Sequence, residues 1–366
     1  MSRDIGLSRR AALSIAGALA LSAGSARAQD PAASPSPAPD PPKVDVTGFI
    51  DAYYGYNFNQ VDPLFRTFDV QHNTFSLSLA EVAFAKAVTP ESRVGFRVDL
   101  DFGKTADLVA AFEPESNGSE IYKHVQQGYA SLLTGKVQWD FGKFVTPIGA
   151  EVIESQDNWN YTRSILFGYA IPFNHTGLRA TWAASDKVSL AGYLVNGWNA
   201  GSEINGDKTF AVNATLKPSP KFTWYVNYMG GKEVEDGDTR NLFDTTASLA
   251  LTDKFTVMAN YDYGKEGDVK WWGVAGYAKY QASPEWALAG RYEYVDDTEG
   301  GFMLLGTTGQ SLTVTSDHTI AGALRARLEY RTDFADEELF PKDDGTFSKS
   351  QTSLTVGIVV AFGGKI

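Results

Sequence analysis

The feature that most constrains this chain is a two-residue alternation of apolar and polar side chains along almost its whole length. Residues 92–103 show it clearly, because every second side chain is bulky and apolar: Val94, Phe96, Val98, Leu100 and Phe102. Successive side chains of a β-strand point to opposite faces, so such a segment has one apolar face and one charged face. Nearly every strand therefore needs an apolar environment on one side and water on the other.

We predict sixteen strands with this period, most of them about ten residues or longer. One segment changes phase between Leu79 and Ala80, which predicts either a β-bulge near Glu81 or a short amphipathic helix. The predicted strands lie near 44–58, 73–88, 92–103, 121–133, 136–144, 175–184, 187–197, 208–217, 221–230, 241–252, 254–264, 271–281, 285–295, 309–316, 322–332 and 351–362.

Short and long connections alternate between these strands. The short ones read TPES, TGK, ASDK, PSP, TDK and SPE, and the others run from about six to about thirty residues. Ten residues at about 3.3 Å each, tilted near 45°, cover roughly 25 Å, the height of an outer-membrane apolar band. The sequence therefore predicts an all-β fold: a transmembrane antiparallel β-barrel of about 16 strands over 44–362, with short periplasmic turns and long extracellular loops.

The start of the chain has the composition of a targeting segment. Basic residues, a short apolar run and the small-residue pattern ARA predict a signal peptide over 1–28. The Pro-rich stretch 29–43 predicts a disordered leader, and residues 363–366 a C-terminal tail after the barrel. We therefore expect export to the Gram-negative outer membrane, where lipid and lipopolysaccharide surround the barrel.

Sixteen strands enclose an interior too wide for side chains to fill, which predicts water inside. A charged lining would screen and orient solutes there, whereas the alternative is that these charges only pair across strands and stabilise the wall. The polar faces give the candidate pore-lining residues Arg93, Arg97, Asp99, Asp101, Arg179, Lys279, Arg291, Glu293, Arg325, Arg327, Glu329 and Arg331.

The connection over 145–174 is the longest and is too apolar for a solvated loop tip. Loops of this length in compact proteins are usually functional. We expect it to fold into the barrel and narrow it, with acidic side chains facing the Arg-rich wall across the constriction; the alternative is an outer loop packed on its neighbours. The candidate constriction residues are Glu151, Glu154, Asp157 and Arg163.

Composition excludes several other classes of protein. The chain has no cysteine, which rules out disulfides and thiolate chemistry, and its net charge of −12 argues against nucleic-acid binding. No phosphate-binding loop, zinc-protease motif or calcium loop is present. We therefore predict no catalytic residues, no metal and no cofactor.

Several stretches of the sequence resemble the outer-membrane β-barrel porins described as OmpL-like. The resemblance covers about residues 45–362 and includes GFIDAYYGYNFN, SRVGFRVDLDFG and DFGKFVTPIGAEVIESQDNWNYTRSILF. It implies a Gram-negative outer-membrane porin and names no solute. One departure is the GGKI that follows Phe362, where such barrels usually end on an aromatic residue.

The expected function is a water-filled channel for passive diffusion of small hydrophilic solutes or ions. Two alternatives stay open at this point: a barrel enzyme of the lipase or protease type, and a closed structural or adhesive barrel. A homotrimer is plausible by analogy with sixteen-stranded porins. Charge selectivity stays open, because arginines are frequent on the predicted walls while the chain as a whole is acidic.

Overall fold

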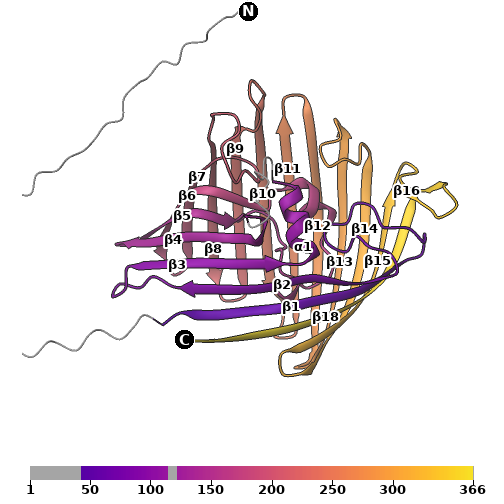
Figure 1. The fold of residues 1–366 in the computed structure, drawn as a ribbon, viewed down its shortest axis with the longest axis horizontal. Helices are drawn as coiled ribbons and strands as arrows, with labels where there is room; N and C mark the ends of the chain where they lie inside the picture. The colour runs from indigo at the N-terminus through magenta and orange to yellow at the C-terminus, as the bar shows by residue number, and fades with distance from the viewer. Residues whose placement is uncertain (1–42, 114–121, 366) are drawn as a thin grey trace, which may run out of the picture. The chain divides into compact units, whose positions relative to one another are not determined.

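The computed structural model describes residues 43–113 and 122–365. Sixteen strands form one closed antiparallel barrel in which sequence neighbours pair, and β1 closes the ring against β18 (Figure 1). The predicted fold class is therefore confirmed. The predicted signal peptide and all of the predicted leader except its last residue lie outside the described residues.

Most barrel strands have the lengths that the alternation predicted, and β14 is longer than its weak pattern indicated. The connections carry α1 (Lys104–Ala111), η1 (Tyr122–His124), η2 (Ser155–Asp157), the π-helical turn η3 (Leu166–Ala170) and a small hairpin of β16 (Phe340–Pro341) and β17 (Phe347–Ser348). The barrel strands are β1 (Asp45–Asn57), β2 (Thr74–Lys86), β3 (Val94–Phe102), β4 (Val125–Thr134), β5 (Val137–Val145), β6 (Asn174–Ser185), β7 (Val188–Val195), β8 (Thr209–Ser219), β9 (Phe222–Lys232), β10 (Thr239–Ala250), β11 (Phe255–Glu266), β12 (Val269–Ser283), β13 (Trp286–Glu299), β14 (Thr308–Ala321), β15 (Leu324–Ala335) and β18 (Ser350–Lys365).

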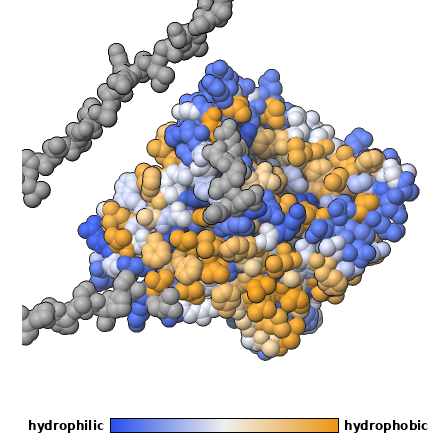
Figure 2. Space-filling model, viewed as in Figure 1, coloured by the Kyte–Doolittle hydropathy of each residue, from blue (hydrophilic) through white to orange (hydrophobic). Residues whose placement is uncertain are grey.

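The barrel is polar inside and apolar outside. Val94 and Phe96 are exposed on β3, whereas Asp99 on the opposite face of the same strand is fully buried. In Figure 2 hydrophobic residues form a band across the visible wall, and hydrophilic residues gather at the rims. This pattern is the reverse of a water-soluble protein, in which charged side chains are almost never fully buried unless paired, and it fits a wall whose outer face meets lipid.

None of the helices that the structure describes combines the length and the apolar character needed to cross a membrane.

The phase change in β2 is a β-bulge, and the helix alternative for this segment is wrong. Asp51 pairs with Leu79 while Ala52 pairs with Leu77, so Ser78 has no partner opposite it. The extra residue turns Ser78 and Leu79 to the same buried side and restores the alternation beyond them. The bulge lies three residues before the predicted position.

Two connections differ from their expected form. The predicted tail continues β18, because Gly363, Gly364 and Lys365 pair with the first residues of β1. The link between β11 and β12 was expected to be about six residues but is a two-residue turn, residues 267–268, because both strands continue to it. Gly267 has a φ of 58°, a conformation that glycine adopts without steric cost.

The reversed polarity predicts a depth-dependent cost for charge on the outer face. Val314 lies near the middle of β14 with its side chain exposed, so Val314→Arg should reduce the free energy of unfolding in lipid vesicles by about 2–4 kcal/mol. Ile320 lies on the same face near the turn, so Ile320→Arg should cost about 0–1 kcal/mol. Urea titration measures both, and equal costs would contradict a lipid-facing outer surface.

Candidate functional site

The long connection between β5 and β6, residues 146–173, packs against inward-facing side chains of the barrel wall; we call it the inner loop. Its apolar side chains Ile153, Leu166 and Phe167 are buried in one cluster with wall residues. The indole of Trp271 on β12 donates a hydrogen bond of 3.0 Å to the Ala170 carbonyl. The inner loop is therefore held to the wall by apolar as well as polar contacts.

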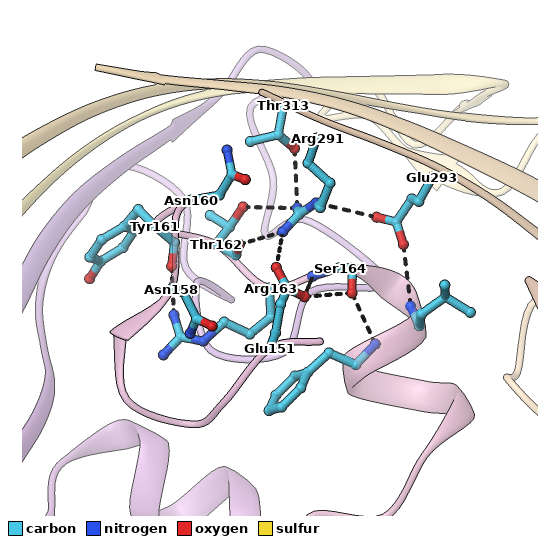
Figure 3. Close-up of polar contacts among 12 residues, drawn as sticks. Glu151, Asn158, Asn160, Tyr161, Thr162, Arg163, Ser164, Arg291, Glu293 and Thr313 are labelled. Atoms are coloured by element: carbon cyan, nitrogen blue, oxygen red, sulfur yellow. Dashed lines mark hydrogen bonds and ion pairs between the residues drawn. The ribbon is translucent and has the colours of Figure 1, made fainter. Parts of the chain in front are cut away.

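Arg291 on β13 makes the central polar contact between the wall and the inner loop (Figure 3). Its guanidinium donates to Glu151 Oε1 at 2.6 Å, to the Thr162 carbonyl at 2.7 Å and to Thr313 Oγ1 at 3.1 Å. The second oxygen of Glu151 accepts from the amide of Ser164 at 2.7 Å. Both charged side chains are almost completely buried, so the pair needs this set of hydrogen bonds to offset its desolvation.

Two wall carboxylates bind backbone amides of the inner loop. Glu329 accepts from the amides of Tyr161 at 2.5 Å and Thr162 at 3.0 Å. Glu293 accepts from the amide of Ile165 at 2.8 Å, where the π-helical turn begins (Figure 3). Buried carboxylates that accept backbone N–H groups form strong, charge-assisted hydrogen bonds, so these two residues fix the path of the backbone.

Two arginines of β15 bind backbone carbonyls of the inner loop. Arg327 donates to the Ser155 carbonyl at 2.5 Å and to the Asn158 carbonyl at 2.9 Å. Arg331 donates to the Arg163 carbonyl. Both guanidinium groups are almost completely buried. These two predicted pore-lining residues therefore face the inner loop and not open water.

Arg163 is buried and forms its hydrogen bonds within the inner loop itself, so it does not line an open channel. It donates to the carbonyls of Val152 at 3.2 Å, Ile153 and Tyr161 at 2.5 Å. Its guanidinium also lies over the Phe68 ring, 4.9 Å from the centroid. The charge is thus compensated by carbonyl oxygens and an aromatic face, and it tightens the loop onto itself.

The helical spacing of Glu151, Glu154 and Asp157 does not place them on one face, because only a three-residue 3₁₀ turn forms there. Glu151 contacts Arg291 directly, so the expected gap between acidic loop and basic wall is closed at that point. Glu154 accepts from Gln126 on β4 at 2.7 Å, and Asp157 is exposed. Burial raises the pKa of Glu154, and the nearby Asp157 carboxylate raises it further.

The other predicted pore-lining residues divide by exposure. Arg93 lies in the turn before β3 and donates to the Leu133 carbonyl, so it lies at the rim. Two acids on the inner face of β3 are buried: Asp99 and Asp101. Four basic residues on inner faces keep some exposure: Arg97, Arg179, Lys279 and Arg325.

A second loop, the connection between β1 and β2, also packs inward, and this was not predicted from the sequence. Arg66, in the connection between β1 and β2, is buried and pairs with Asp69 at 2.8 Å and with Asp333 on β15 at 2.9 Å. Its neighbour Thr67 lies directly against Gly168 of the inner loop. The only sequence signal is an Arg and an Asp three residues apart, and it does not identify the distant partner.

A polar pocket of about 320 Å³ lies between the inner loop and the wall of β9 to β12. Loop residues Glu151, Asp157 and Trp159 line one side, and wall hydroxyls such as Tyr225 and Thr246 line the other. Within the two described ranges, no group of three or more histidines or acids could hold a metal ion. The pocket is suited to water and small polar solutes.

Comparison with known proteins connects this arrangement to a family and a fold. A family model described as "Putative beta-barrel porin-2, OmpL-like" matches residues 43–362. No curated protein matches the sequence.

Solved structures share the barrel at low sequence identity. The outer membrane channel DcaP of Acinetobacter baumannii is similar with a TM-score of 0.60 and 12% identity, over 87% of this chain and 97% of that one. The anion-selective porin from Comamonas acidovorans gives 0.58 and 11%, over 87% and 99%. The trimer form of OmpT of Vibrio cholerae gives 0.55 and 12%, over 87% and 99%. These likenesses establish the fold.

The wall residues that bind the inner loop form a set that we call the clamp: Arg291, Glu293, Arg327, Glu329 and Arg331. The clamp predicts that Arg327 controls the order of the inner loop. Arg327→Gln removes a buried guanidinium that binds three loop carbonyls, so amide hydrogen exchange in residues 155–165 should speed up by at least about tenfold. Arg325→Gln is the matched control, because Arg325 is partly exposed and contacts only the Gln156 carbonyl of the loop. Mass spectrometry of exchanged peptides measures both, and equal small effects would show that Arg327 does not hold the loop.

Proposed function

This chain belongs to the OmpL-like family of β-barrel porins, and from that we propose a channel narrowed by its inner loop, with a preference for anions. The protein is a porin of the Gram-negative outer membrane, a water-filled channel for passive diffusion of small hydrophilic solutes or ions. The proposal concerns where the path runs and which solutes it favours.

The observation that carries the proposal is the uneven attachment of the inner loop, which bonds to β13, β15, β1 and β4 while its side toward β9 to β12 borders a pocket. Buried ionic and backbone contacts hold residues 151–165 against β13 to β15. On the opposite side the loop faces the polar pocket along β9 to β12. A solute therefore passes between the free side of the loop and this second wall, where hydroxyl groups replace part of its hydration.

The preference for anions rests on the charged side chains inside the barrel that remain exposed to water and do not belong to the clamp. Arg97 on β3 and Arg325 on β15 keep 41% and 28% of their side chains exposed. Lys279 on β12 has no ion-pair partner within the described ranges and interacts electrostatically with Arg325. Asp157 is the acid that interacts with both arginines. Arg97 and Arg325 are ion-paired with Asp99 and Asp317, but these two acids are buried while the basic groups keep contact with water. We propose that this difference in exposure attracts anions.

The fold and family are those of channels, and we propose that the chain works as one and not as an enzyme. The buried charges of the clamp are engaged with the loop backbone rather than exposed in a reaction cleft. An enzyme or a closed structural barrel would both lack ohmic conduction. We also propose a homotrimer, which the similarity to the trimer form of OmpT supports.

Single-channel recording in planar bilayers tests the path. The purified protein should give stable ohmic steps, and deletion of residues 152–160 should raise the conductance because it removes the narrowing segment. Deletion of residues 342–346, an exposed tip of the β16–β17 hairpin, should leave conductance unchanged. A folded barrel without steps would contradict the channel, and an unchanged conductance in the first variant would contradict the constriction.

Reversal potentials in a salt gradient test the selectivity. Replacing Arg97, Lys279 and Arg325 together by Gln should shift the reversal potential toward cations, because it removes the accessible positive charge. Replacing three exposed lysines in short turns causes the same change in net charge and should give no shift: Lys187, Lys221 and Lys254. Equal shifts in the two triple variants would show that net charge, and not these three residues, sets the preference.

A further inference from the structure

An aromatic pocket lies on the loop side of the barrel, separate from the polar pocket beneath the inner loop. It has a volume of about 220 Å³ and is built by four connections, with Phe112, Tyr169, Phe173, Trp198 and Phe302 among its walls. Gly168, Ile171, Asn199 and Leu304 complete the lining, so none of the lining residues carries a charge. We call it the aromatic cup.

The aromatic walls of the cup are stacked on a rigid base. Phe302 lies parallel to Trp271 with ring centroids 3.5 Å apart, and Trp198 meets Phe302 edge-on at 5.7 Å. Arg240 covers both Trp198 and Phe302 at about 5 Å and is neutralised by Glu266 at 2.8 Å. Interlocked rings of this kind hold their orientation, so the cup keeps its shape.

Two buried carboxylates fix the loops that carry these rings. Glu233 accepts the amide of Trp198 at 2.6 Å and the hydroxyl of Thr209 at 2.8 Å. Asp297 is fully buried and accepts the amides of Met303 and Leu305, each at 2.9 Å, so it holds the turn that presents Phe302. Surface loops seldom carry such buried anchors, and a site that is already ordered does not lose ordering entropy when it binds.

The polar atoms of the cup favour a ligand that accepts hydrogen bonds. Asn199 Oδ1 is occupied by the amides of Phe173 and Asn174 at 2.6 and 3.3 Å. The Tyr169 hydroxyl is occupied by the Arg66 carbonyl at 3.2 Å. Within residues 43–113 and 122–365, the indole N–H of Trp198 and the amide group Nδ2 of Asn199 have no partner. The Trp198 indole and the Asn199 amide therefore supply donors at the cup, and the Tyr169 hydroxyl, which donates to Arg66, can still accept.

Size and chemistry together define the ligand class. An apolar cavity of about 150 Å³ is large enough for benzene, so the cup has room for one substituted ring. A sugar has several hydroxyl groups that need acceptors, and burying them unpaired is costly. A carboxylate or ammonium group would find no opposite charge in the lining. A neutral aromatic ring with one oxygen acceptor satisfies the walls and both donors.

We propose that the aromatic cup is a binding site for neutral, single-ring aromatic solutes that carry a hydrogen-bond acceptor. Edge-to-face contacts with Phe302 and Trp198 hold the ring, because Trp271 and Arg240 take the two faces of Phe302. The Trp198 indole N–H donates to the oxygen of the solute. The site captures such solutes on the side of the long loops, against the last residues of the inner loop. It does not depend on the anion preference proposed above, since binding is measured without conduction.

Fluorine NMR on the full-length protein in lipid nanodiscs tests the proposal. 4-Fluorobenzyl alcohol should show saturable line broadening with protein-loaded nanodiscs, beyond the partitioning seen with empty ones. 4-Fluorobenzoate and 2-fluoro-2-deoxyglucose should not show it, because one is charged and the other has too many hydroxyl groups. No saturable broadening with the alcohol, or equal or tighter binding of either other probe, would overturn the proposal.

Variants locate the site. Phe302→Ala should weaken binding of the alcohol by at least about tenfold, because it removes one wall of the cup. Trp198→Phe keeps a ring and removes the indole donor, so it should weaken binding by about three- to tenfold. If Phe302→Ala disturbs folding, the conservative Trp198→Phe variant decides whether the proposal holds. Unchanged binding in Trp198→Phe would overturn the proposal.

A control variant should bind the alcohol within about twofold of the unchanged protein. Trp182→Phe alters an exposed outer-face tryptophan of β6, far from the cup in the fold. A loss in Trp182→Phe as large as in Trp198→Phe would show that the signal comes from the lipid side.

Discussion

The structure depends on one constraint: lipid surrounds the barrel and water fills the inside. Backbone N–H and C=O groups cannot stay unpaired in hydrocarbon, so the strands must close into a ring, as β1 and β18 do. The same constraint sends apolar side chains outward and charged ones inward. A row of charged residues such as Arg327, Glu329 and Arg331 is then available on the inner wall to capture another part of the chain.

The inner loop is held by buried charged groups, and leaving any one of them unpaired would destabilise the fold. Arg291 and Glu151 are buried together, and Glu329 and Arg327 bind amides and carbonyls of the loop backbone. Removing one partner of such a set leaves the other charge buried and unpaired in a low-dielectric environment, which costs several kcal/mol of stability. The loop therefore has a defined position in the barrel, and we propose that the pathway follows the polar pocket along β9 to β12.

Much of the fold could be predicted from the sequence because its signals are local. Two-residue alternation identified the strands, and even the phase change between Leu79 and Ala80 corresponded to a real bulge at Ser78. Strand ends were less certain, as β18 and the two-residue link between β11 and β12 show. Pairing with a neighbouring strand extends these segments, and a single sequence does not report that neighbour. The contacts of Arg93 and Arg163 could not be predicted for a related reason: Arg93 binds a carbonyl at the rim, and Arg163 binds carbonyls within its own loop.

The sequence by itself determined the class of fold, the outward and inward faces of the strands, and the presence of one unusual long loop. These follow from side-chain chemistry repeated every two residues, since lipid and water act on each residue separately. Only the tertiary structure decided which charges are accessible and which are engaged. Arg325 and Arg327 stand on the same face of one strand, yet one is partly exposed and the other is buried under the loop. That difference arises from contacts more than 160 residues apart along the chain, and local pattern carries no information about such contacts.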